Sequence, residues 1–465
     1  RALRHAFFAE RQKSRQGVGW LGWRVSSLGD APWWLGVPAF LVEAAGLLAV
    51  AVLSFALWRR PESARPLAHP AGPPVDAEIV VRCTRPDVTS LRATLVAARP
   101  IAPVLVVDPH ARPELAALAV EHGARYVATD PDQRDGLHIA ADLVGAASFL
   151  LLEAGDVPHP SVLRSLLPWF DEPGGAVVRG PVPASNGESA EHGSGGRHDL
   201  QFERRALIPA LGARGLAPFV GSGALLRTEA IRRTSLVRSS LPMVAADLTG
   251  ALFRAGWQIA APGGSPLVAV APISSPAELE DVRACEASAA RHLLVGDHGA
   301  LRINRLTPAQ RLSLVAQAVR PLAGVRRGIT VALLVGVLLA GRLPFTPDPI
   351  ALTALWAPWF VLSASALYLL SAGELRPGAR VRWSMRMLGA SWRGALAPDG
   401  RPDPAEHVLG SAFGLHHGVA PAAAVAAISV VIGMRALRDR LTHPLAAMPV
   451  DHTAGLLLMA LWSLA

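Results

Sequence analysis

The residues with the clearest capacity for chemistry are acidic side chains at the ends of short apolar runs. Asp108 ends "PVLVVD", and Glu153 follows "SFLLL", with Asp156 three residues further on. Carboxylate oxygens are the ligands that hard divalent cations such as Mg2+ or Mn2+ take when they hold phosphate groups. Whether these acids share a cation stays open at this point, because in an extended chain the side chains of Glu153 and Asp156 would point in opposite directions.

The elements that must position these acids are short strands alternating with helices between residues 75 and about 305. The runs "EIVV", "PVLVVD", "ARYVAT", "ASFLLLEAGD" and "GGAVVRG" have strand character, whereas "VTSLRATLVAAR", "PELAALAVEHG" and "HPSVLRSLLPWF" have helical spacing. This alternation predicts a mostly parallel sheet that is covered by helices on both faces. Ligands of such sheets bind at the carboxyl ends of the strands, where Asp108 and Glu153 fall.

The composition indicates a membrane protein. The chain of 465 residues is 51% hydrophobic and only 17% charged, with a net charge of +9. The apolar run 33–58 has Trp at both ends, is followed by two arginines and is long enough to cross a bilayer. Glu43 lies inside it and is expected to face protein or a polar cavity. Further apolar runs occur at about 329–343, 349–370, 419–434 and 454–465.

The arginine distribution suggests how the chain is arranged about that membrane. Arginines flank the 75–305 region, which predicts an integral protein of the plasma (inner) membrane with its soluble domain in the cytoplasm. No interleaved basic and aromatic pattern points to nucleic acid. The predicted segments are a basic N-terminal segment at 1–32, a transmembrane helix at 33–58, a Pro-rich linker at 59–74, an α/β domain at 75–305, and amphipathic and transmembrane helices at 306–465 with an interfacial helix near 376–396.

The two cysteines carry little functional information. Cys83 and Cys285 are far apart in the sequence and form no C-x-x-C pair. Neither a zinc site nor a disulfide framework is indicated, so we expect two buried free thiols.

Three motifs, in this order and within this membrane layout, resemble the membrane-embedded family 2 glycosyltransferases of the cellulose synthase type. They are "LLLEAGDVPHPSVL" with "PWFDEP", "FVGSGALLRTEAI" and "LTGALFRAGWQIA". The resemblance covers about residues 33–396. It implies a GT-A-like α/β domain inserted between transmembrane helices and transfer of a hexose from a nucleotide-sugar to a polysaccharide or lipid-linked acceptor, with Mg2+ or Mn2+ as cofactor.

The resemblance also assigns roles to residues. It implies donor binding by Asp108, Glu153 and Arg291, and metal binding by Glu153 and Asp156. Acceptor binding would fall to Gly221, Ser222 and Trp257. Asp247 is the candidate for a displaced general base.

The catalytic motifs of that family are altered in this chain. Its D-x-D pair corresponds to Glu153-Ala154-Gly155, its catalytic E-D to Val244-Ala245, and its Q-x-x-R-W to a segment that ends Arg291-His292. The sequence therefore predicts impaired transfer.

Two alternatives stay open. The first is a non-catalytic pseudoglycosyltransferase subunit, without a metal, that binds a partner synthase or a glycan. The second is a transporter-like protein that uses Glu43, His416 and His417 as polar intramembrane groups. The transporter is disfavoured because there are few spans and no inverted repeat.

Overall fold

The computed structural model describes the α/β domain and the helices beside it. The described residues are 19, 22–26, 28, 32–56, 76–83, 88–129, 136–171, 174–180, 207–234, 241–262, 267–269, 276–296, 299–302, 305–319, 321–340 and 390–396. The predicted Pro-rich linker at 59–74, the predicted spans at 349–370, 419–434 and 454–465, and His416 with His417 lie outside these residues.

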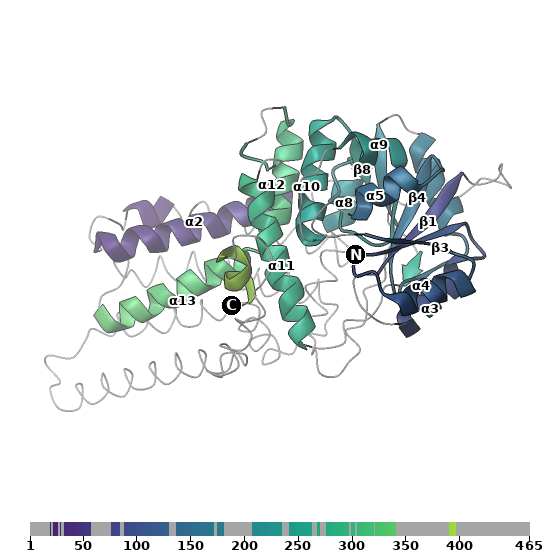
Figure 1. Ribbon diagram of the computed structural model, residues 1–465. Coiled ribbons are helices and arrows are strands. Elements are labelled where there is room, and N and C mark those ends of the chain that lie inside the picture. The colour runs from purple at the N-terminus through teal and green to yellow at the C-terminus, as the bar shows by residue number, and fades with distance from the viewer. Residues whose placement is uncertain are drawn as a thin grey trace, which may run out of the picture.

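Within the described ranges a sheet of seven strands forms the centre of the domain (Figure 1). Its order is β3-β2-β1-β4-β7-β6-β8, and a separate two-stranded sheet joins β5 (Val157–Pro158) to β9 (Val268–Ala269). The seven strands are β1 (Ala77–Arg82), β2 (Val104–Asp108), β3 (Arg125–Ala128), β4 (Ser148–Glu153), β6 (Gly175–Arg179), β7 (Ala224–Arg227) and β8 (Gln258–Ala260). All five strands expected from the sequence are therefore present.

The strand directions fit the predicted, mostly parallel sheet with one exception. β3, β2, β1 and β4 run parallel to one another, and β6 is parallel to β8. β7 runs antiparallel to both β4 and β6, which the sequence did not indicate. Because β7 is reversed, the segment that precedes it lies at the edge where β1, β2 and β4 end. We call this side of the sheet the carboxyl edge.

Helices cover both faces of the sheet, as the alternation of strands and helices predicted (Figure 1). Ile79 and Val81 of β1 pack toward α3 (Val88–Ala98), α4 (Pro113–Glu121) and α6 (Val162–Leu166). Val80 points to the opposite face, because successive strand side chains alternate, and shares a core with Phe149 and Leu252. The helices on that face are α5 (Gly136–Leu143), α8 (Ile208–Gly212), α9 (Thr228–Arg233) and α10 (Leu241–Arg254).

The helix expected over residues 159–170 is shorter than predicted. α6 ends at Leu166, and a 3-10 turn, η1 (Leu167–Asp171), continues from it. Pro168 lacks a backbone N–H and clashes with the preceding turn, which explains the early end of the α-helix.

The predicted amphipathic helix that starts at Thr307-Pro308 is α12 (Pro308–Val319). The backbone N–H of Gln310 donates to Thr307 Oγ1 at 3.2 Å, and the Thr307 N–H donates to Gln310 Oε1 at 2.9 Å. These reciprocal bonds form a capping box, which satisfies N–H groups that a helix start leaves open. α11 (Pro276–Val295) packs between α10 and α12.

Two further helices extend from the α/β domain (Figure 1). α2 (Trp33–Ala56) forms over the first predicted span and packs against α12 and α13 (Ala323–Ala340). Glu43 of α2 accepts an ion-paired hydrogen bond from Arg24 at 2.8 Å, and the Arg24 side chain is fully buried. This confirms that Glu43 faces protein. Among the described residues, no helix combines the length and the apolar character needed to cross a membrane.

Candidate functional site

Charged residues end four strands at the carboxyl edge. β1 ends at Arg82, β2 at Asp108, β4 at Glu153 and β6 at Arg179. These four strands share one direction, so the four side chains are placed along one side of the sheet. All but Glu153 are buried. Ligands of open α/β sheets bind at this edge, so these charged side chains are placed where a ligand would meet them.

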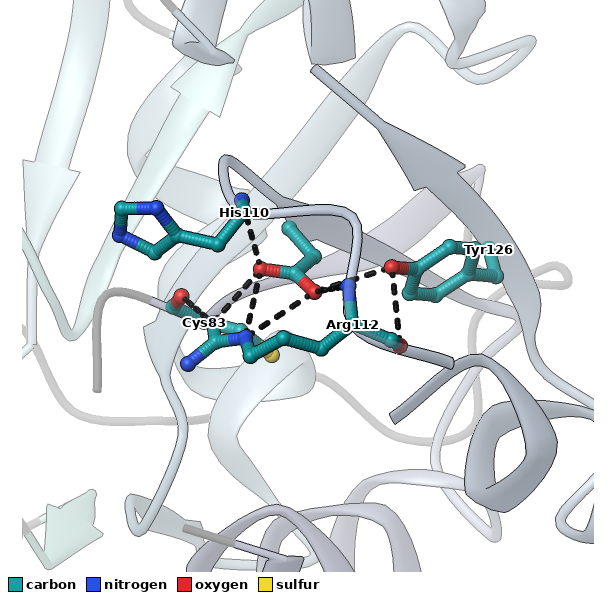
Figure 2. Close-up of polar contacts among 5 residues, drawn as sticks. Cys83, His110, Arg112 and Tyr126 are labelled. Atoms are coloured by element: carbon teal, nitrogen blue, oxygen red, sulfur yellow. Dashed lines mark hydrogen bonds and ion pairs between the residues drawn. The ribbon is translucent and has the colours of Figure 1, made fainter. Parts of the chain in front are cut away.

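Asp108 is enclosed by hydrogen-bond donors (Figure 2). Its Oδ1 accepts from the backbone N–H of His110 at 3.1 Å, and its Oδ2 accepts from the backbone N–H of Arg112 at 2.8 Å. The Arg112 guanidinium donates to both oxygens, with Nη2 to Oδ1 at 2.6 Å. The Tyr126 hydroxyl donates to Oδ2 at 2.9 Å. The protein itself therefore occupies both oxygens of this carboxylate.

This enclosure fixes the protonation states of the cluster. Burial alone would raise the pKa of Asp108, but the bonds from Arg112, His110 and Tyr126 outweigh it and lower the pKa to about 2. Burial, followed by the hydrogen bond to Asp108, raises the pKa of Tyr126 to about 12. Burial and the Asp108 charge raise the pKa of the Cys83 thiol to about 12. At neutral pH the cluster thus contains an ionised carboxylate beside a neutral phenol and a neutral thiol.

The turn between β2 and α4 makes this arrangement possible. Ala111 has a φ of +51°, which is uncommon for a residue with a side chain. The turn brings Arg112 back onto Asp108, and Arg112 Nη2 also donates to the Cys83 carbonyl. Sequence reasoning missed Arg112, although the Asp108–Arg112 spacing of four residues was a signal that could have identified the pair.

Glu153 has a different partner. Arg82 Nε donates to Glu153 Oε1 at 2.7 Å, and Arg82 Nη2 donates to the same oxygen. The two residues are register partners on the neighbouring parallel strands β1 and β4. The Arg82 side chain is 8% exposed and that of Glu153 is 21% exposed, so the carboxylate is the more accessible member. Sequence reasoning also missed Arg82, because the pairing depends on strand register.

The Glu153–Asp156 segment is a closed turn and not an extended chain, which corrects the expectation of opposed side chains. The Glu153 N–H donates to Asp156 Oδ2 at 2.8 Å, and the Asp156 N–H donates to the Glu153 carbonyl at 3.0 Å. Gly155 has a φ of +103° and donates its N–H to Thr94 Oγ1 at 2.8 Å. A residue with a side chain at position 155 would be strained, so this turn is not a D-x-D with one residue exchanged.

The predicted acceptor loop meets this turn. Ser222 Oγ donates to the buried Asp156 carboxylate, and the Gly223 N–H donates to the Leu151 carbonyl at 2.9 Å. Gly221 has a φ of +86°, a conformation that favours glycine. The structure therefore brings Glu153, Asp156 and the Gly221–Ser222 pair together at the carboxyl edge.

The other predicted site residues, Asp247, Trp257 and Arg291, are not part of these two turns. Asp247 is half-buried in α10. This part of α10 lies near the 221–223 loop, because the N–H of Phe219, just before the loop, donates to Thr249 Oγ1 at 3.0 Å. Trp257 precedes β8 at the opposite edge of the sheet and packs against the core. Arg291 lies on α11, and its Nη1 donates to the Ala395 carbonyl at 3.4 Å.

The acids at the carboxyl edge do not fit a divalent metal as they are arranged. Asp108 is enclosed by Arg112 and Tyr126, Glu153 is paired with Arg82, and Asp156 accepts from Ser222. In the part of the chain that the structure describes, no group of three or more His, Cys, Asp or Glu side chains is placed to hold a metal ion.

No protein-family model and no curated protein matches the chain. Among solved structures it is similar to a mannosyltransferase from Pyrobaculum calidifontis in complex with GDP-Man and Mn2+, with 17% identity over 73% of this chain and 97% of that one and a TM-score of 0.49. Glucosyl-3-phosphoglycerate synthase from Mycobacterium tuberculosis matches with 19% identity over 45% and 75% of the two chains and a TM-score of 0.33. S. aureus TarS 1-349 in complex with UDP-GlcNAc matches with 10% identity over 64% and 90%, with a TM-score of 0.35.

Proposed function

We propose that this chain is a glycosyltransferase-like protein with a GT-A-like domain that binds a nucleotide-sugar at the carboxyl edge. The observation that carries the proposal is the meeting of two turns at this edge. The Glu153–Asp156 turn follows β4, and the glycine-serine loop precedes the reversed strand β7. Ligand sites of open α/β sheets lie outside the carboxyl ends of the strands.

The proposed arrangement places the donor near the ends of β1, β2 and β4 and the acceptor beside the 221–223 loop. Gly221 and Ser222 would border the acceptor. Asp247, on α10 beside this loop, is the proposed base that takes the proton of the acceptor hydroxyl, for which it would have to come within about 3 Å. Ala245 occupies the position of the base in the family that the sequence resembles, and alanine cannot accept a proton. We therefore expect slow transfer.

The acceptor and the location of the protein are part of the same proposal. A polysaccharide or lipid-linked acceptor at the cytoplasmic face of the plasma membrane fits the apolar composition. The described part of α2 exposes large apolar side chains, among them Trp33, Leu41 and Leu48, which are suited to contact with lipid. Sedimentation of the intact protein with membranes after an alkaline carbonate wash would support this location, and release into the supernatant would contradict it.

The decisive experiment measures nucleotide binding and turnover separately. Calorimetric titration of the purified full chain with UDP, GDP and their sugar conjugates should show binding. Release of nucleoside diphosphate from the same conjugates, with a glucan or lipid-linked sugar as acceptor, should be very slow. Absence of binding by every nucleotide would overturn the proposal.

A second candidate function, a non-catalytic subunit, is favoured by the engagement of the acids at the edge with protein donors. Binding without any turnover would support this subunit, which would then act on a partner synthase or a glycan. Robust turnover that Asp247→Asn abolishes would instead identify Asp247 as the base. The exposed Asp171→Asn variant is the matched control, since it removes an acid of η1, away from the 221–223 loop.

A further inference from the structure

The feature that leads beyond nucleotide binding is the ion pair between Arg82 and Glu153. The pair places the Arg82 guanidinium beside Glu153, the acid at the end of β4 that was predicted to bind a cation. Both Nε and Nη2 of Arg82 donate to Oε1 of Glu153. Arg82 thus occupies Oε1, one of the two oxygens with which Glu153 could bind a metal.

The balance of charges at the carboxyl edge also disfavours a metal ion at Glu153. Among the residues that the structure describes at this edge, the acids are Asp108, Glu153 and Asp156, and the arginines are Arg82, Arg112 and Arg179. Their formal charges, three negative and three positive, balance before any cation binds. A divalent ion at Glu153 would add two positive charges beside the buried Arg82 guanidinium and would compete with it for the carboxylate. Like charges repel, so binding of the ion here is unfavourable.

We propose that the diphosphate of the nucleotide binds at this edge without a divalent metal, and that Arg82 provides the positive charge that a metal ion would otherwise supply. This inference rests on the proposed function, because it concerns how the same site holds its donor. The mannosyltransferase that the fold resembles was solved with Mn2+, whereas the residues of this chain are arranged for a cation of their own.

The chemistry of arginine suits this role. A guanidinium is permanently charged and donates two parallel N–H groups to phosphate oxygens in a planar, bidentate geometry. The two nitrogens Nε and Nη2 of Arg82 face Glu153, and its Nη1 donates to no acceptor in the described residues. Because Glu153 is the more exposed partner, its carboxylate can shift away while Arg82, held in β1, remains to meet the phosphate.

The first measurement compares binding of UDP and GDP by the intact protein in EDTA with binding in Mg2+ or Mn2+. We expect dissociation constants that agree within about threefold. Binding that requires the metal would overturn the inference and leave the proposed function standing. No binding under either condition would overturn both.

Variants of the ion pair sharpen the test. Arg82→Gln should weaken binding in EDTA by about tenfold or more. It also leaves Glu153 without its arginine, so Mn2+ should now restore part of the binding. The double variant Arg82→Gln/Glu153→Gln should lose binding in EDTA and should not respond to Mn2+. Metal rescue that persists in the double variant would contradict the role of this pair.

A matched control exists at the opposite edge of the sheet. Arg125, the first residue of β3, pairs with Glu78 near the start of β1, so Arg125→Gln removes an arginine from an ion pair that lies away from the proposed site and whose arginine is 53% exposed. This variant should bind both nucleotides as the unmodified protein does. Thermal unfolding of each variant reports whether it folds, and the comparison of EDTA with metal in the unmodified protein decides the question even if Arg82→Gln does not fold.

Discussion

Asp108 and Glu153 end the two strands that flank β1, yet their surroundings differ. Asp108 is 0% exposed, and donors from His110, Arg112 and Tyr126 occupy both of its oxygens. Glu153 has a side chain that is 21% exposed, and its bonds from Arg82 fall on a single oxygen. The comparison teaches that an acid at a strand end can be a structural anchor or a more accessible partner, depending on how deeply it is buried and how many donors surround it.

The largest effect is expected from Asp108→Asn. The amide NH2 of asparagine would face groups that are themselves donors, and Arg112 would lose its counter-charge. Breaking a buried pair in this way costs about 3–5 kcal/mol in the free energy of unfolding. Urea denaturation measures the loss. The exposed Asp171→Asn variant is the control and should change stability by less than about 0.5 kcal/mol.

Acid should remove the stabilisation that Asp108 provides, without any mutation. The pKa of Asp108 falls from 3.8 in the unfolded chain to about 2 in the folded protein, so the folded state binds fewer protons between these values. The stabilisation is complete above the unfolded pKa and is lost as pH falls from about 4 to about 2, a loss of about 2 kcal/mol. Urea denaturation at stepped pH measures this decline, which should shrink in Asp108→Asn. An equal decline in both proteins would contradict the assignment.

Glu153→Gln should have a smaller effect on stability. The amide oxygen of glutamine can still accept from Nε and Nη2 of Arg82, because both bonds fall on one atom. We expect a loss of about 1 kcal/mol, the usual value for weakening one partly exposed hydrogen-bonded pair. Denaturant midpoints of the two variants, measured side by side, test the comparison directly. A loss as large as that of Asp108→Asn would mean that both acids are structural anchors.

The smallest effect, and the only stabilising one, is expected from Ala111→Gly. Glycine relieves the strain of the left-handed conformation, although it also gains entropy in the unfolded chain. The balance is a stabilisation of about 0.5 kcal/mol. Ala117→Gly, at an exposed position within α4, should instead destabilise by about 1 kcal/mol. Thermal unfolding of this pair shows whether the turn that closes the Asp108 cluster is strained.

The sequence allowed the strands and the strand-end acids to be predicted because both depend on local pattern. The apolar runs that end at Asp108 and Glu153 identified β2 and β4 and placed both acids at one edge. The partners of these acids were not predicted. The contact of Arg112 with Asp108 depends on a turn that places Ala111 at positive φ. The contact of Arg82 with Glu153 depends on the register between β1 and β4. Neither property is encoded in the spacing of apolar residues.

The closed turn after Glu153 was missed for a similar reason. The pattern suggested a continuing extended chain, but Asp156 folds back onto the Glu153 N–H and is held by Ser222 of a distant segment. A contact between segments so far apart in the sequence cannot be derived from either segment alone. The cytoplasmic side of the domain and its attachment to the membrane remain predictions.

The reversed strand β7 also has a consequence for the order of folding. β1, β2 and β3 are consecutive in the sequence and are joined by helices, so each of their pairings closes a short stretch of chain, whereas β4 pairs with β1 only after β2 and β3 have intervened. β7 reaches β4 only after a long intervening segment, with Arg227 opposite Ser148. Closing long loops is entropically slow. The three strands β1, β2 and β3, which carry Asp108, should therefore assemble first, and Glu153 and the loop with Ser222 should reach the edge later.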